Sequence, residues 1–128
     1  MNNSFIFSEG KLFAGEKGTD IQSLSWNPHP SFRGVSMKNL VCGSNTAGRL
    51  SCHLVKIDPG CLIGNHMHEG KMELHEVIDG DGICIVGENS LPYCAGAVAC
   101  IPDNIYHSVE AGGNGLVSWQ SFYRHLFR

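Results

Sequence analysis

Long apolar runs, dense basic clusters and paired-cysteine motifs are all missing from this sequence, and each absence excludes a class of protein. No uninterrupted apolar stretch approaches the length that spans a membrane. The basic residues are scattered and the net charge is −3 with His neutral, whereas a surface that binds nucleic acid needs a denser basic stripe. Residues 1–7 have neither the basic start nor the apolar run of a secretory signal. We therefore expect a cytoplasmic protein with no membrane and no nucleic-acid partner.

Cysteine is present without any pattern that indicates disulfides. The six cysteines include no Cys-x-x-Cys pair, and a chain without an export signal is expected to meet reducing conditions. Several of them lie in apolar runs, such as Cys84 within residues 82–86, where free cysteine behaves as a small buried hydrophobe. We interpret the cysteines as free thiols rather than as a zinc or redox site.

No long window shows helical periodicity, and sixteen glycines interrupt the chain. Short apolar or alternating segments, separated by turns that contain glycine or proline, begin at about residue 36. The expected strands are 50–57, 74–78, 83–86, 97–101, 107–110 and 116–123, and the expected turns include 58–60, 79–82, 87–89, 101–104 and 112–115. This pattern predicts an all-β sandwich or barrel.

The chain is expected to contain two parts. Its 128 residues fit one compact domain, which we place at residues 36–128. Residues 1–35 are punctuated by glycine and proline too often for a long helix, so we expect an extended lead-in. This lead-in has three candidate roles: an edge strand, a lid over a site, or an arm that contacts a partner subunit.

The histidines suggest a metal site. His66 and His68 are two residues apart, and residues at that spacing on a strand project from the same face, so both imidazoles can meet one ion. Glu73 follows after Gly70, where the chain can turn and bring a carboxylate to the same point. His107 follows a Pro-Asp-Asn turn and could close the site from a neighbouring strand. The alternative is a surface or hydrogen-bonded histidine pair that binds no metal.

Three imidazoles and one carboxylate form a borderline set of ligands. Such a set suits Mn, Fe, Co, Ni, Cu or Zn better than Ca or Mg, which prefer oxygen ligands. Four protein ligands leave one or two positions open on a five- or six-coordinate ion, where substrate, water or dioxygen can bind. We therefore predict one divalent transition metal ion, whose identity these ligands do not define.

Two segments carry a family resemblance. Residues 59–80 resemble the first motif of the cupin superfamily, G-x5-H-x-H-x4-E-x6-G, at every defined position. Residues 96–107 are similar to its second motif, G-x5-P-x-G-x2-H-x3-N, with Asn104 in place of the turn glycine and Ala111 in place of the closing asparagine. Asparagine accepts left-handed backbone angles better than most residues, so we expect the turn to be kept. Fifteen residues separate the two motifs, as in small bacterial members of the family.

The resemblance implies a double-stranded β-helix, also called a jelly-roll barrel, with a metal ion inside one mouth. The ligands carried over from the motifs are His66, His68, Glu73 and His107. Many single-domain members form homodimers by strand exchange or sheet packing, so the resemblance also implies a homodimer in which the lead-in reaches the partner.

Two further histidines are candidates for catalysis. His75 shares the face of Glu73 by strand alternation, and a histidine one step from the ion can act as a general acid or base because imidazole titrates near working pH. His53 lies on the strand that enters the first motif and could line the pocket. A structural role, such as an orienting hydrogen bond, is the alternative for each. His29 lies outside both motifs and is expected at the surface or an interface.

Three functions fit these features. The first is a metalloenzyme that acts on a small oxygen-rich acid or sugar by isomerase or lyase chemistry, with His75 moving the proton. The second is an iron-dependent dioxygenase that uses the same four ligands. The third is a non-catalytic domain that binds a small molecule. The inward-facing His75 favours the first, because redox chemistry gives it no obvious role.

Overall fold

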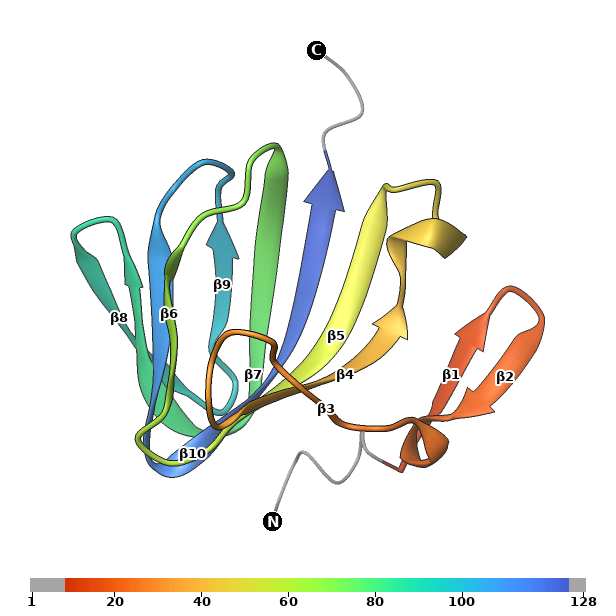
Figure 1. Cartoon of the computed structure of the whole chain (residues 1–128), viewed down its shortest axis with the longest axis horizontal. Helices are drawn as coiled ribbons and strands as arrows, with labels where there is room; N and C mark the ends of the chain where they lie inside the picture. Colours follow the sequence, from red (N-terminus) through yellow and green to blue (C-terminus); the bar gives the residue numbers. More distant parts are fainter. Residues whose placement is uncertain (1–8, 125–128) are drawn as a thin grey trace.

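The computed structural model describes residues 9–124, which form an almost entirely β structure (Figure 1). The strands are β1 (Lys11–Ala14), β2 (Lys17–Asp20), β3 (Asn27–Pro28), β4 (Val35–Val41), β5 (Leu50–Ile57), β6 (Leu62–His66), β7 (Lys71–Val86), β8 (Asn89–Cys94), β9 (Val98–Ile101) and β10 (His107–Arg124). Two short 3-10 turns, η1 (Ile21–Ser23) and η2 (Gly43–Asn45), complete the described elements. The strands pair antiparallel throughout, which confirms the all-β prediction.

One curled sheet contains most of the strands, in the order β3-β4-β5-β10-β7-β8, with β6 added to β10 and β9 added to β7. The two long strands β7 and β10 run side by side along most of their length. The other neighbour of each long strand changes partway along its length. β10 pairs with β6 near its start and with β5 near its end, while β7 pairs first with β9 and then with β8. In Figure 1 the strands curve around an interior, and the long pair forms part of the wall.

The turns expected at 79–82 and 112–115 are wrong, because both segments lie inside the long strands. The two glycine-rich segments meet instead as an irregularity in the ladder, where the register shifts between Ala111 and Leu116. Gly80 and Gly115 both have positive φ there, and a Cβ on Gly80 would collide with the carbonyl oxygen of Gly115. Glycine is therefore required for the close approach of the two backbones rather than for chain reversal.

The core occupies the interior beside the polar site. Strand alternation places Glu73, His75 and Val77 of β7 on one inward face, and all three are buried. Val77 belongs to the main apolar cluster, which also contains Val35, Val55, Ile57, Ile63, Cys84, Tyr93, Ile101, Val109, Ala111 and Leu116. The inward column of β7 thus passes from polar residues into the core within five positions.

The lead-in contains more regular structure than expected. β1 and β2 form a hairpin of their own, and β3 pairs with β4. A second apolar cluster joins Ile21 of the lead-in to Leu40, Leu54 and Ile78 of the main sheet. A role of residues 1–35 as a dimer arm stays a prediction. Within residues 9–124, no helix has the length and apolar character needed to cross a membrane.

Candidate metal centre

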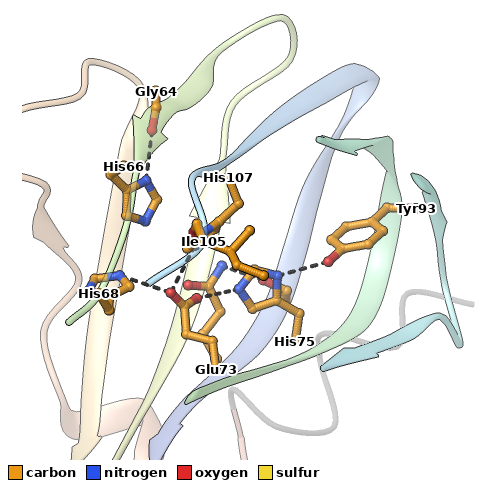
Figure 2. A network of polar contacts seen from close by, with 10 residues as sticks. Gly64, His66, His68, Glu73, His75, Tyr93, Ile105 and His107 are labelled. Carbon is orange, nitrogen blue, oxygen red and sulfur yellow. Dashed lines mark hydrogen bonds and ion pairs between the residues drawn. The ribbon is translucent and has the colours of Figure 1, made fainter. Parts of the chain in front are cut away.

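Three strands and one loop bring four potential metal ligands together (Figure 2). His66 is the last residue of β6 and pairs in register with His107, the first residue of β10. Glu73 lies near the start of β7. The ligand atoms of His66, His68, Glu73 and His107 all lie within 4.8 Å of one another.

His68 reaches this cluster from a loop and not from a strand. Because β6 ends at His66, strand alternation does not place both imidazoles as the sequence pattern suggested. The loop is held instead by a hydrogen bond of 3.0 Å, which the backbone N–H of Asn104 donates to the carbonyl oxygen of His68. Asn104 has φ of 63°, so asparagine adopts the left-handed conformation expected at this turn.

Two of the imidazoles are oriented as metal ligands. His66 Nδ1 lies 2.7 Å from the carbonyl oxygen of Gly64, and His107 Nδ1 lies 3.0 Å from that of Ile105. A carbonyl oxygen only accepts hydrogen bonds, so Nδ1 donates in both rings and carries the proton. In the neutral ring this leaves the lone pair on Nε2, which is the state that binds a metal ion.

Glu73 is the centre of the cluster. Its Oε1 lies 2.9 Å from Nε2 of both His68 and His107, and its side chain is only 2% exposed. Burial alone would raise the pKa of this carboxyl, but hydrogen bonds from His107, His68 and His75 outweigh it and hold the pKa below the usual range. Glu73 is therefore ionised near neutral pH.

The pKa values of two ligands move in opposite directions. Burial lowers the pKa of His66, and the hydrogen bond to Gly64 only partly compensates. Burial also acts to lower the pKa of His107, but the hydrogen bond with Glu73 outweighs it, so this pKa is raised. Nε2 of His107 and Oε1 of Glu73 lie 2.9 Å apart, and two lone pairs at this distance need a cation between them. A proton on His107 Nε2 thus occupies the place that a metal ion would take.

His75 contacts the back of this cluster. The side chain is 1% exposed, and its Nε2 lies 2.5 Å from Oε2 of Glu73. Its Nδ1 lies 2.9 Å from the hydroxyl oxygen of Tyr93 (Figure 2). His75 is not among the residues that line the neighbouring cavity. Its predicted part in proton transfer stays a prediction, and its contacts are those of a residue that orients Glu73.

A cavity of about 490 Å³ opens beside the cluster. Its lining consists of imidazoles, other neutral polar side chains and apolar side chains: His29, Ser31, Phe32, Met37, His53, Val55, Ile63, His66, Met67, His68, Gln120 and Phe122. None of these lining residues is a lysine, arginine, aspartate or glutamate. The cavity is large enough for a small metabolite and carries no fixed charge of its own apart from the adjoining Glu73.

His53 lines the cavity, where the sequence had placed it as a candidate. Its Nδ1 lies 2.8 Å from Oδ1 of Asn39, so Nδ1 donates and Nε2 retains a lone pair. Burial lowers the pKa of His53, and the negative charge of Glu73 only partly offsets this. The ring is therefore neutral near pH 7 and able to accept a proton.

His29 and Phe32 also line the cavity, and the sequence analysis did not assign either to it. The backbone N–H groups of Ser31 and Phe32 donate to Nδ1 of His29 at 3.0 and 3.3 Å. The proton of His29 therefore lies on Nε2, which gives the ring the opposite polarity to His53. Neither residue falls in a motif or an alternating strand, so the sequence pattern does not indicate their position. In the structure the loop between β3 and β4 brings both residues to the cavity.

The comparisons with known proteins agree with this architecture. The family model described as "Cupin domain" matches residues 53–123, which is more than half of the chain. The chain belongs to the cupin family. The match covers both motifs and all four candidate ligands.

Relatives of this cupin support the fold. An oxalate-binding protein of Thermotoga maritima is 33% identical over 60 residues, or 47% of this chain, and the match covers half of that relative's length. The crystal structure of a predicted oxalate decarboxylase from Thermotoga maritima superposes with a TM-score of 0.75 at 23% identity, covering 81% of this chain and 96% of the other. A cupin 2 conserved barrel domain protein from Rhodopseudomonas palustris has a TM-score of 0.72 at 20% identity, with coverages of 93% and 83%.

The donor set of this cupin fits a divalent transition metal ion. Three imidazole nitrogens and one carboxylate oxygen converge on one point, and two of the rings are oriented by carbonyl groups so that Nε2 faces inward. His66, His68, Glu73 and His107 can therefore hold such an ion. The donor types do not define which of the transition metals it is.

Proposed function

We propose that this cupin binds one divalent transition metal ion through His66, His68, Glu73 and His107 and acts on a small oxygen-rich acid or sugar by lyase or isomerase chemistry. The observation that carries the proposal is the position of the four-ligand cluster at the wall of a cavity that also contains a neutral, deprotonated imidazole. A bound divalent ion supplies a Lewis acid that polarises a carbonyl or hydroxyl oxygen.

The charges of the site favour a small anionic ligand. A divalent ion with the single carboxylate of Glu73 leaves one net positive charge, and none of the described lining residues adds another. A carboxylate or an enolate balances that charge, whereas phosphorylated substrates are usually held by arginine or lysine. The lining is also rich in apolar side chains such as Phe32, Val55 and Phe122, which exclude water and strengthen the electrostatic interactions inside.

Within this proposal His53 is the group that moves the proton. Its Nε2 carries a lone pair, its pKa is lowered by burial, and it lines the cavity. His29 presents an N–H to the same space and is suited to bind a substrate oxygen. In this cavity His53 thus offers a proton acceptor and His29 a hydrogen-bond donor, in addition to the metal ligands. His75 lies behind Glu73 and supports the site from there.

A second candidate is a binding protein without catalysis. The relative from Thermotoga maritima is named for binding oxalate, and this name favours a small dicarboxylate as a ligand of the present chain as well. Catalysis and binding make different demands on His53, since only catalysis requires a proton acceptor.

Metal content and ligand binding test the proposal together. Protein purified without chelator or nickel affinity resin is expected to contain about one equivalent of metal per chain. Oxalate, small hydroxy acids and sugar acids are then screened by thermal shift on loaded protein and on the His66→Ala variant. We expect a ligand to raise the Tm of the metal-loaded protein only. We also expect turnover of an acid that binds, and His53→Gln should abolish this turnover without loss of binding.

Absence of metal uptake would refute the proposal. Turnover by His53→Gln equal to that of the wild type would remove His53 from the proposal. A bound iron ion with oxygen uptake would favour the dioxygenase instead.

A further inference from the structure

A buried chain of hydrogen bonds runs from the candidate metal centre into the core. Oε2 of Glu73 meets Nε2 of His75 at 2.5 Å, and Nδ1 of His75 meets the hydroxyl of Tyr93 at 2.9 Å (Figure 2). Tyr93 and Cys84 belong to the same buried core cluster. The exposed fractions of the four residues are 2%, 1%, 4% and 0%, so solvent does not compete for these hydrogen bonds.

The direction of the chain follows from its two ends. A carboxylate oxygen accepts, so His75 donates from Nε2–H to Oε2 of Glu73. With its proton on Nε2, the ring accepts at Nδ1, where the Tyr93 hydroxyl donates. Burial, together with Cys84, raises the pKa of Tyr93, which keeps its hydroxyl protonated.

We propose that Tyr93 and His75 are positioning residues that fix Glu73 as a ligand through one oxygen only. Oε2 is engaged by His75, and only Oε1 faces the imidazoles of His68 and His107. Bidentate coordination by Glu73 would require Oε2 to leave His75, which would leave the buried Nε2–H of His75 without an acceptor. The chain of hydrogen bonds thus keeps one further coordination position free for a ligand. This inference rests on the proposed metal site.

Tyr93→Phe tests the inference because it removes a single oxygen atom and keeps the ring in the core. Cobalt(II) is the probe, since its visible absorption depends on coordination number and geometry. We expect Tyr93→Phe to bind cobalt several-fold more weakly, because loss of a direct hydrogen-bond partner of a metal ligand costs about 10–100-fold and Tyr93 acts one step further away, through His75. We also expect a changed visible spectrum. Tyr106→Phe is the matched control, because Tyr106 is 57% exposed and lies next to His107; its affinity and spectrum should equal those of the wild type.

Two substitutions of His75 separate positioning from packing. Glutamine can donate from its amide to Oε2 of Glu73, so His75→Gln should retain most of the cobalt affinity, whereas His75→Leu should lose it. Wild-type affinity and spectrum in Tyr93→Phe would overturn the inference, as would equal loss in His75→Gln and His75→Leu with unchanged far-UV circular dichroism. A wild-type protein that takes up no cobalt would instead overturn the metal site itself. These outcomes are distinguishable in one titration series.

Discussion

His66→Ala separates metal binding from folding more cleanly than any other change in the cluster. His66 is half-buried, and its one described hydrogen bond is to the carbonyl oxygen of Gly64. Removing it leaves Glu73 with all three of its histidine partners. By contrast, His107→Ala would strip a donor from a carboxylate that is 2% exposed, at a cost of about 1–3 kcal/mol. Without metal, His66→Ala should therefore lower the free energy of unfolding by only about 1 kcal/mol.

The effect of metal on this variant can be estimated. An ion present at about a hundred times its Kd stabilises the wild type by about 2.7 kcal/mol. For a chain of 128 residues this raises Tm by about 8–13 °C. If the loss of one ligand weakens binding by about 100-fold, the same concentration stabilises His66→Ala by about 0.4 kcal/mol, or about 1–2 °C.

The assay is thermal unfolding of chelator-treated protein, with and without added cobalt or manganese. His53→Ala is the control, because His53 lines the cavity but is not one of the four ligands, and it should keep the full metal-induced rise in Tm. A rise in His66→Ala equal to that of the wild type would refute the ligand assignment. Loss of the rise in His53→Ala as well would show that the ion binds elsewhere in the cavity.

Two further predictions concern pH and the barrel wall. The pKa of His107 is raised, so in chelated protein its contribution to stability is complete below 6.5 and is lost as the pH rises through the raised value. Metal competes with that proton, so the metal-induced rise in Tm should grow from about pH 6 to about pH 8, and a constant rise would contradict the role of His107. Gly80→Ala should lower the free energy of unfolding, measured in urea, by at least about 2 kcal/mol. The new Cβ would collide with Gly115, and Gly80 has a φ of +85°, which alanine rarely adopts. Gly87→Ala, at φ of +59° in open space, should cost only about 1 kcal/mol, and equal losses would refute the steric argument.

Residues with a short-range pattern were predicted well. The strand expected at 50–57 coincides with β5, because the alternation of Val55 and Ile57 with Lys56 is a local signal. The four candidate ligands come together, although His68 does so from a loop and not by strand alternation. The left-handed conformation at Asn104 also agrees with the expectation from its side chain.

Features that depend on distant partners were not predictable in the same way. The glycines at 79–82 and 112–115 carry the composition of turns, and only the opposite strand shows that they meet each other. β8 was missed because Pro92 interrupts its pattern, which an edge strand tolerates. His29 reaches the cavity through the path of a loop, and loop paths leave no periodic trace.

The pairing of β7 with β10 also has a kinetic consequence. Lys71 lies opposite Arg124 and Glu73 lies opposite Phe122, so residues about fifty positions apart in the chain must meet before the ladder that positions Glu73 is complete. Closing such long loops is slow, because their entropy is lost before the contacts form. We therefore expect the imidazoles from β6 and β10 and the carboxylate from β7 to converge late in folding. An ion that binds them acts on the finished barrel, and its main kinetic effect is to slow unfolding rather than to speed folding.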